Sequence, residues 1–463
     1  MSSSATLVQA MAAEALALGR QDWTGPVLEK AQLCLSDAFS GAFEAAPLAH
    51  SQQAASIAEP GESALIATGR GASHGDAAFA NAVAAHGLVR EDMHTGSVAH
   101  FGVVVWPALL AASALRSGPV TGHAFLTAGA IAYEVGARTG KALMTPQLAR
   151  MFRPTGLCGP LAAATGAGLL LGLDEQALAS AMAFAINTAA GLNEWPHAGG
   201  ADMFFHAGFA AQNGLRAARL AQAGAFGSPS VLEGAAGLFR AIGRTEAPAS
   251  IPLAKAPDEF EILSVFHKAV PACNYAQTPG QAALAALAKF PAAPGKITSV
   301  RVDTTDAALA YPGCARSGPF RNALQAKMSI RFAVAAALLR GEISEACYAD
   351  PADPDITALI PKIDLVADSG FTAAYPARQG ARVTIRSDET ETTAELEDVQ
   401  VAGPDEIRAR LARHATIVLG DHRAAQFLSL LDTAVTAPDI RDLNALCRRD
   451  DTQSSKRSTR NGT

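Results

Sequence analysis

Apolar residues recur at helical spacing over most of the first 250 positions of the chain. Runs rich in Ala and Leu place apolar residues three and four positions apart, the period of an amphipathic helix, and Gly or Pro interrupts them. The clearest predicted helices are 76–88, 122–143, 160–171, 174–190 and 208–223. Thr121 and Asp174 stand where N-caps are expected, and Lys141 stands where a cation favours a helix C-terminus. This region is therefore predicted to be a helical bundle.

The pattern changes near residue 250. The proline-rich phrase APASIPLAKAPDEF marks a connection, after which β-branched residues alternate with other residues. Strands are predicted at 296–304, 381–385 and 390–396, with Asp388 and Glu389 in a hairpin turn, and helices at 278–289 and 327–339. Residues 404–447 return to helical spacing, and the polar tail at 448–463 is predicted to be disordered. An α+β region near 255–400 thus interrupts a helical protein.

Composition narrows the class of partner. A chain of 463 residues is longer than one hydrophobic core usually organises, so two domains are expected. The formal net charge of -6 gives no reason to expect a nucleic acid or an anionic membrane as partner. An anionic substrate would therefore need a local basic pocket.

The compartment follows from the cysteines and the N-terminus. The six cysteines are scattered without a CxxC pair, which disfavours a disulfide framework and a zinc ribbon and favours a reducing compartment. The N-terminus is typical of an amphipathic helix and not of a signal peptide. The most apolar stretch, 103–115, is shorter than the ~20 residues that a membrane span requires. A soluble, cytoplasmic protein is expected.

The densest group of titratable residues lies at 86–100, HGLVREDMHTGSVAH. Its members are His86, Arg90, Glu91, Asp92, His94 and His100. A glycine-bearing loop of this kind, leading directly into an apolar helix, is where a scaffold presents catalytic side chains. A single histidine here is more often part of a solvated connection, but the cluster as a whole favours a site. The spacing of His94 and His100 lacks the HExxH pattern, so a metal site is not predicted.

Two further segments supply cations. Lys268, in FHKAVPACNY, stands where the helical region gives way to the α+β region, and domain junctions are favoured places for small-molecule sites. Burial lowers the pKa of a lysine and can make it a base. Arg153, in RMFRPTG, is placed to bind a carboxylate through both arms of its guanidinium. Lys141 and Arg331 are further cationic candidates, and a surface position is the simpler interpretation of each.

Taken in order, these segments resemble the MmgE/PrpD family. The resemblance covers residues 5–445 and is carried by AAFANAVAAHGLVREDMHTGSVAHFGVVVWPALLA, RPTGLCGPLAAATGAGLLLGLDEQ, NEWPHAGGADMFFHAGFAAQNGLRAA, HKAVPACNYAQTP and KMSIRFAVAAALLRG. It implies a mainly α fold: a large all-helical domain built from both chain ends (1–255 completed by 400–447) and a smaller α+β lid domain (256–399). It also implies a homodimer and a site in the cleft between the domains, without a cofactor.

The family's activities include 2-methylcitrate dehydratase, cis-aconitate decarboxylase and iminodisuccinate epimerase, which share proton transfer at a carbon next to a carboxylate. This chemistry needs cations that hold the carboxylates and a positioned base. The chain departs from the family pattern at Met93 (for Thr), Arg153 (for His), Met203 (for Lys) and Phe332 (for an aromatic hydroxyl). His94, His100 and Lys268 are retained.

The departures weaken a dehydratase, which needs an acid aimed at a leaving hydroxyl. The preferred hypothesis is a cofactor-independent epimerase of a small amino or imino polycarboxylate, similar to iminodisuccinate epimerase. Lys268 and His100 are the predicted bases on the two faces of Cα, and Arg153 is the predicted carboxylate clamp. Further predicted substrate-binding or orienting residues are Asp92, His94, Tyr133 and Arg331. A hydroxy-acid dehydratase or related lyase is the first alternative, and a non-catalytic binding protein is the second.

Overall fold

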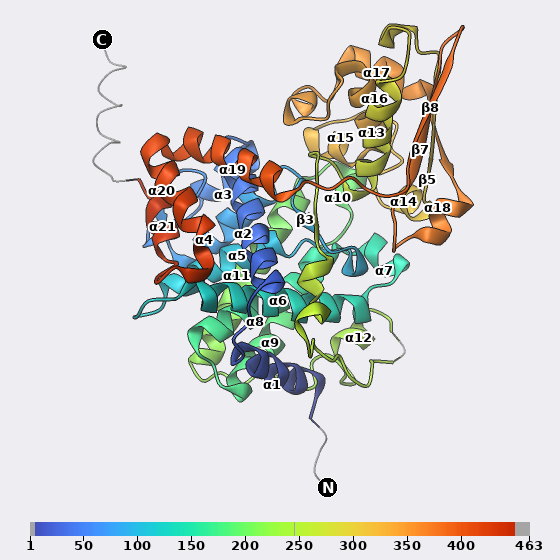
Figure 1. Ribbon diagram of the computed structural model, residues 1–463. Coiled ribbons are helices and arrows are strands. Elements are labelled where there is room, and N and C mark those ends of the chain that lie inside the picture. The colour runs from blue at the N-terminus through green and yellow to red at the C-terminus, as the bar shows by residue number, and fades with distance from the viewer. Residues whose placement is uncertain (1–4, 245, 450–463) are drawn as a thin grey trace.

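The computed structural model describes residues 5–244 and 246–449 and is mainly helical, which confirms the predicted class (Figure 1). Most of the tail predicted to be disordered, residues 450–463, lies outside the described residues. The helices before residue 250 are α1 (Leu7–Gly19), α2 (Pro26–Glu44), α3 (Ala49–Ser56), α4 (His74–Ala85), α5 (Gly102–Ala114), α6 (Gly122–Leu143), α7 (Pro146–Met151), α8 (Pro154–Leu171), α9 (Glu175–Ile186), α10 (Trp195–Ala198), α11 (Asp202–Gln222) and α12 (Leu238–Ala241).

The later elements alternate helices and strands before returning to helices. They are α13 (Asn274–Leu287), β5 (Ser299–Thr304), α14 (Asp306–Ala310), α15 (Ala323–Met328), α16 (Ile330–Arg340), α17 (Pro354–Leu359), β6 (Ile363–Ala367), α18 (Ser369–Ala374), β7 (Ala381–Arg386), β8 (Glu391–Leu396), α19 (Pro404–Leu419), α20 (Asp421–Asp432) and α21 (Asp442–Cys447). Two short antiparallel pairs complete the fold: β1 (Ser63–Ala64) with β2 (Gly71–Ala72), and β3 (Asp92–Met93) with β4 (Phe266–His267).

Buried apolar side chains form two large clusters. The first joins residues of 7–265 to residues of 411–447, so both ends of the chain contribute to one core. Figure 1 shows the C-terminal helices α19 to α21 in red, and α19 packs closely on α2. We call residues 5–265 and 404–449 the helical part. The second cluster joins residues 272–394, which we call the sheet part, to one side of α3, α4 and α11.

The sheet part holds a four-stranded sheet in the order β6-β5-β7-β8. β5 runs parallel to β6 and antiparallel to β7, and β7 forms a hairpin with β8. Helix α13 packs against β7 and β8, and α16 packs against α13. The predicted strands are therefore present, whereas β6 was not predicted.

Helix α8 begins at Pro154 and not at Pro160, where the sequence pattern placed its start. A proline inside a helix leaves the carbonyl four residues earlier without its donor. Here that carbonyl, of Gly156, accepts a hydrogen bond from Ala190 N at 3.2 Å, so the helix continues through Pro160. By length and composition α8 could cross a membrane, but 94% of the stretch is buried inside the protein, as in a core helix.

Gly122 at the start of α6 lies against the C-terminal helices. Its N–H donates to Ala437 O at 2.8 Å, and a Cβ would overlap the carbonyl of Ala434. Gly122→Ala is expected to lower the free energy of unfolding by about 1–3 kcal/mol, because backbone must shift to admit the methyl group. Urea unfolding measures this loss. Gly118→Ala, where a Cβ would meet nothing within 4 Å, is the control, and an equal loss there would contradict the packing argument.

Candidate active site

The titratable cluster lies on the loop that joins α4 to α5, and all six of its members are at most 8% exposed. The pairing of β3 with β4 holds Asp92 opposite His267 and fixes this loop against the segment that leads from the helical part to the sheet part. Val89 and Val98 have φ of 60° and 55°, left-handed values that strain a β-branched residue. Such strain collects at functional sites, where the surrounding structure enforces it.

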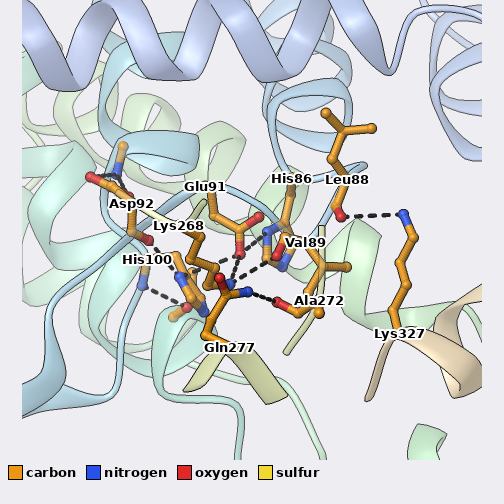
Figure 2. A network of polar contacts seen from close by, with 12 residues as sticks. His86, Leu88, Val89, Glu91, Asp92, His100, Lys268, Ala272, Gln277 and Lys327 are labelled. Carbon is orange, nitrogen blue, oxygen red and sulfur yellow. Dashed lines mark hydrogen bonds and ion pairs between the residues drawn. The ribbon is translucent and has the colours of Figure 1, made fainter. Parts of the chain in front are cut away.

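Glu91 is the centre of a buried polar network (Figure 2). Lys268, which is fully buried, donates from Nζ to Glu91 Oε1 at 3.1 Å and to Val89 O at 3.0 Å. The Nδ1 atoms of His86 and His100 each lie 3.3 Å from the same Glu91 oxygen. One carboxylate oxygen therefore faces an ammonium and two imidazoles.

The charges in this network are fixed by its geometry. Burial opposes ionisation of Glu91, but the Lys268 ammonium and the two histidines hold the pKa of that carboxyl well below its usual range. Both contacts of Lys268 Nζ are hydrogen-bond acceptors, which favour the charged amine. Lys268 is thus placed as a proton donor with an anionic partner.

His100 is placed as the complementary base. Its Nδ1 donates to Asp92 O at 2.6 Å, which fixes the proton on Nδ1 and leaves the lone pair on Nε2. Burial, followed by the charge of Lys268, lowers the pKa of His100 well below the usual value. The imidazole is therefore neutral at pH 7, and Nε2 is free to take a proton.

Arg153 is a buried guanidinium with no carboxylate partner among residues 5–244 and 246–449. It is 4% exposed, donates to Tyr311 Oη at 3.4 Å and lies 3.2 Å from His86 Nε2 through its other arm. Its Nε has no hydrogen-bond partner among the same residues. A buried charge is costly unless it is paired, so this arrangement suits an anionic ligand.

A cavity brings these groups together. It has a volume of about 20 Å³ and is lined by Val89, Met93, Val98, His100, Arg153, Met203, Lys268, Cys273, Asn274, Tyr275, Tyr311 and Met328. A single water needs roughly 10–15 Å³ of such volume, so a polycarboxylate requires the cavity to widen. His100 comes from the helical part, whereas Tyr275 and Met328 come from the sheet part, so a small separation of the two parts would open it.

The other predicted site residues lie outside the lining of this cavity. Tyr133 donates to Asp92 Oδ2 at 2.5 Å beneath His100, and burial raises the pKa of Asp92 to about 6. His94 contacts Glu261 at 3.0 Å and lines a separate cleft. Arg331 donates to the Ile363 carbonyl at 2.9 Å and also to the Ala315 carbonyl. Of the predicted residues, His100, Lys268 and Arg153 are brought together, and Asp92 supports His100 through its carbonyl.

Several residues in the cavity lining or in the polar network beside it were not assigned a role from the sequence. His86 and Glu91 stood inside the titratable cluster, which was the available signal for both. Tyr311 comes from a loop without a motif. Cys273 has its Sγ 3.5 Å from Cys314 Sγ, and this contact lowers the pKa of Cys273 to about 7. Among the residues that the structure describes, no group of three His, Cys, Asp or Glu side chains could hold a metal ion.

Two half-buried histidines, His50 and His206, predict acid sensitivity. Burial lowers the pKa of His50 to about 3 and that of His206 to about 4. The unfolded chain binds protons at these positions as pH falls through about 6.5, while the folded chain does not until pH 3–4. The free energy of unfolding is therefore expected to fall as pH drops from 6.5 to 4. Urea unfolding at several pH values tests this, and His50→Phe, which keeps the stacking on Phe204, should flatten the slope.

His100, Lys268 and Arg153 line one cavity, an arrangement that suits acid–base chemistry on a small anionic molecule. Comparison with known protein families finds two family domains that match this chain. Residues 9–250 match the MmgE/PrpD N-terminal domain, and residues 270–427 match the MmgE/PrpD C-terminal domain. The chain belongs to the MmgE/PrpD family.

Two curated relatives are similar to the chain. The cis-aconitate decarboxylase-like protein oryM of Aspergillus oryzae (strain ATCC 42149 / RIB 40) is 28% identical over 465 residues, covering 92% of this chain and 94% of that protein. The cis-aconitate decarboxylase of Aspergillus terreus is 30% identical over 230 residues, which cover 48% of this chain and 47% of that enzyme. Both names describe lyase-type proteins, and neither describes an epimerase.

Proposed function

We propose that the chain is a lyase that removes CO₂ from a small unsaturated polycarboxylate, using its own side chains and no cofactor. The observation that carries this proposal is the Lys268 ammonium, held by Glu91 on the wall of a cavity that also presents an unpaired Arg153. Arg153 binds one carboxylate of the substrate, and Lys268 supplies the proton. The cis-aconitate decarboxylase relatives support the same reaction class.

The proposed step balances with one proton. The C–C bond to the departing carboxylate breaks and its electron pair forms a new double bond, while the π electron pair of the original double bond moves onto the far carbon. That carbon takes the proton from Lys268 Nζ, which leaves a neutral amine. Solvent restores the ammonium after CO₂ leaves. Arg153 and Lys268 stabilise the negative charge that develops on the remaining carboxylate.

The geometry favours this reaction over the epimerisation expected from the sequence. His100 Nδ1 and Lys268 Nζ both lie within 3.3 Å of one Glu91 oxygen, so the two side chains are neighbours. Two-base epimerisation needs its proton carriers on opposite faces of Cα. A lyase needs a single proton delivered to one face, with a second group such as His100 to position or relay it.

Epimerisation remains the second candidate because the two carriers hold complementary protonation states. His100 is neutral and Lys268 is charged, which is the starting state of a two-base exchange. If the cavity widens by moving Lys268 away from His100, the two could flank a Cα atom.

One experiment separates these functions. The protein is incubated in D₂O with cis-aconitate, with the unsaturated dicarboxylate 3-methylglutaconate, with 2-methylcitrate and with each iminodisuccinate isomer, and the mixtures are followed by NMR. Release of CO₂ from either unsaturated acid, with one deuterium in the product, supports the lyase. Deuterium exchange at Cα of iminodisuccinate without CO₂ release supports the epimerase. Loss of water from 2-methylcitrate supports a dehydratase, and binding without turnover of any compound supports the non-catalytic alternative.

The homodimer implied by the family resemblance and the cytoplasmic location expected from the sequence belong to the same proposal. Light scattering of the purified protein measures its mass in solution, and a monomer would exclude the dimer. Fractionation of the source cells tests the location.

A further inference from the structure

The cavity has an apolar side as well as a charged one. Met93, Met203 and Met328 line it, and each is at most 2% exposed. They come from β3, from the first turn of α11 and from the end of α15, three segments distant in the sequence. Val89 and Val98 line the cavity with them. Three buried thioethers from separate elements thus line the same cavity, and we call them together the methionine wall (Met93, Met203 and Met328).

The cationic groups of the cavity are few. Arg153 is the guanidinium in the lining, and Lys268 is the ammonium, which already has Glu91 as its partner. The nearby Lys327 is turned away, because its Nζ bonds Glu345 at 2.7 Å and the carbonyl of Leu88 at 3.2 Å. Within the described residues, the lining therefore offers cationic partners for at most two carboxylates and not for three.

We infer that the substrate is a dicarboxylate whose third branch is apolar, with that branch against the methionine wall. The inference rests on the proposed function for the reaction, but the shape of the bound molecule follows from the lining alone. A carboxylate or hydroxyl placed on the methionine wall would lose its water without gaining a partner. An alkyl group there buries its surface favourably, by about 0.8 kcal/mol for each methylene. The methionine wall therefore determines specificity by rejecting a polar third branch.

Two saturated ligands of matched shape test this without requiring turnover. Tricarballylate and 2-ethylsuccinate share two carboxylates, and the third branch ends in a carboxylate in one and in a methyl group in the other. Isothermal titration with the full chain is expected to give binding of 2-ethylsuccinate tighter by about tenfold or more, the cost of one unpaired buried polar group. 2-Ethylsuccinate should also bind about fourfold more tightly than 2-methylsuccinate, because its branch buries one more methylene.

Variants assign the preference to the methionine wall. Met203→Gln and Met328→Gln keep the length of the side chain and add an amide, so each should reduce the preference for 2-ethylsuccinate to a few-fold or less. Met203→Leu, an apolar control of similar volume, should keep it. Circular dichroism of each variant checks folding, and two positions are used so that one folding failure leaves a test.

Tricarballylate binding as tightly as 2-ethylsuccinate, or tighter, would overturn the inference, as would unchanged preference in both glutamine variants. The outcome is distinguishable from failure of the proposed function. If no compound loses CO₂ but 2-ethylsuccinate still binds more tightly, the lyase reaction is wrong while the apolar-branch selectivity stands. If CO₂ is released but tricarballylate binds more tightly, the lyase reaction stands while the apolar-branch selectivity is wrong.

Discussion

Lys268→Met is expected to reduce turnover by about 10²–10⁴-fold, the usual contribution of a positioned general acid. The side chain has no exposed surface and supplies the ammonium nearest to His100 in the cavity. No other lysine lines this cavity among the described residues. Steady-state kinetics on the substrate identified by the D₂O experiment measures the loss, which should fall on kcat more than on KM.

The same substitution is expected to destabilise the fold, which must be separated from the chemical effect. Removing Lys268 leaves Glu91 charged and buried without its cation, a change that typically costs about 3–5 kcal/mol. The double variant Lys268→Met/Glu91→Gln removes both charges and should recover most of that loss in urea unfolding. It should remain as inactive as the single variant.

Recovery of activity together with stability in the double variant would contradict a chemical role for Lys268. The variant Glu91→Gln alone completes the cycle. It keeps the amine but removes the carboxylate that positions it, so turnover in this variant should also fall.

Arg153→Gln is expected to weaken binding of a dicarboxylate by about 2–5 kcal/mol, the usual cost of removing one partner of a buried, hydrogen-bonded charge pair. This corresponds to a factor of roughly 30 to several thousand in Kd. The prediction follows from a guanidinium that is 4% exposed and whose polar side-chain partners, within residues 5–244 and 246–449, are Tyr311 and His86. Titration of 2-ethylsuccinate into both proteins gives the ratio.

Arg331→Gln is the matched control for charge. Arg331 bonds backbone carbonyls at Ile363 and Ala315 and lies outside the cavity lining, so its loss should change Kd by less than about twofold. A second readout needs no ligand. Burial and the charge of Arg153 lower the pKa of His206 to about 4. The pKa of His206 should therefore rise in Arg153→Gln and stay unchanged in Arg331→Gln. NMR titration of the His206 ring measures both. Equal effects of the two substitutions would contradict the assignment of Arg153.

The helices were predictable because their signals are local. Apolar spacing and side-chain caps depend on residues within a few positions, and Thr121 and Asp174 do cap α6 and α9 through their side chains. The hairpin of β7 and β8 was visible for the same reason. Strand β6 was missed because it is short and half exposed, and its pairing partner β5 lies more than 50 residues away. The start of α8 was missed because a distant donor, Ala190, satisfies the carbonyl that Pro160 leaves free.

The sequence by itself determined the family resemblance, the helical class and the three residues that meet in the cavity, His100, Lys268 and Arg153. It also identified the loop at 86–100, because a dense group of titratable residues beside an apolar helix is readable along the chain. Only the tertiary structure decided their chemistry. Charge state and tautomer depend on distances between segments: Glu91 meets Lys268 across 177 positions, and Arg153 meets Tyr311 across 158. Spacing along the chain carries no information about such contacts, because burial and pairing arise only after the two parts have packed.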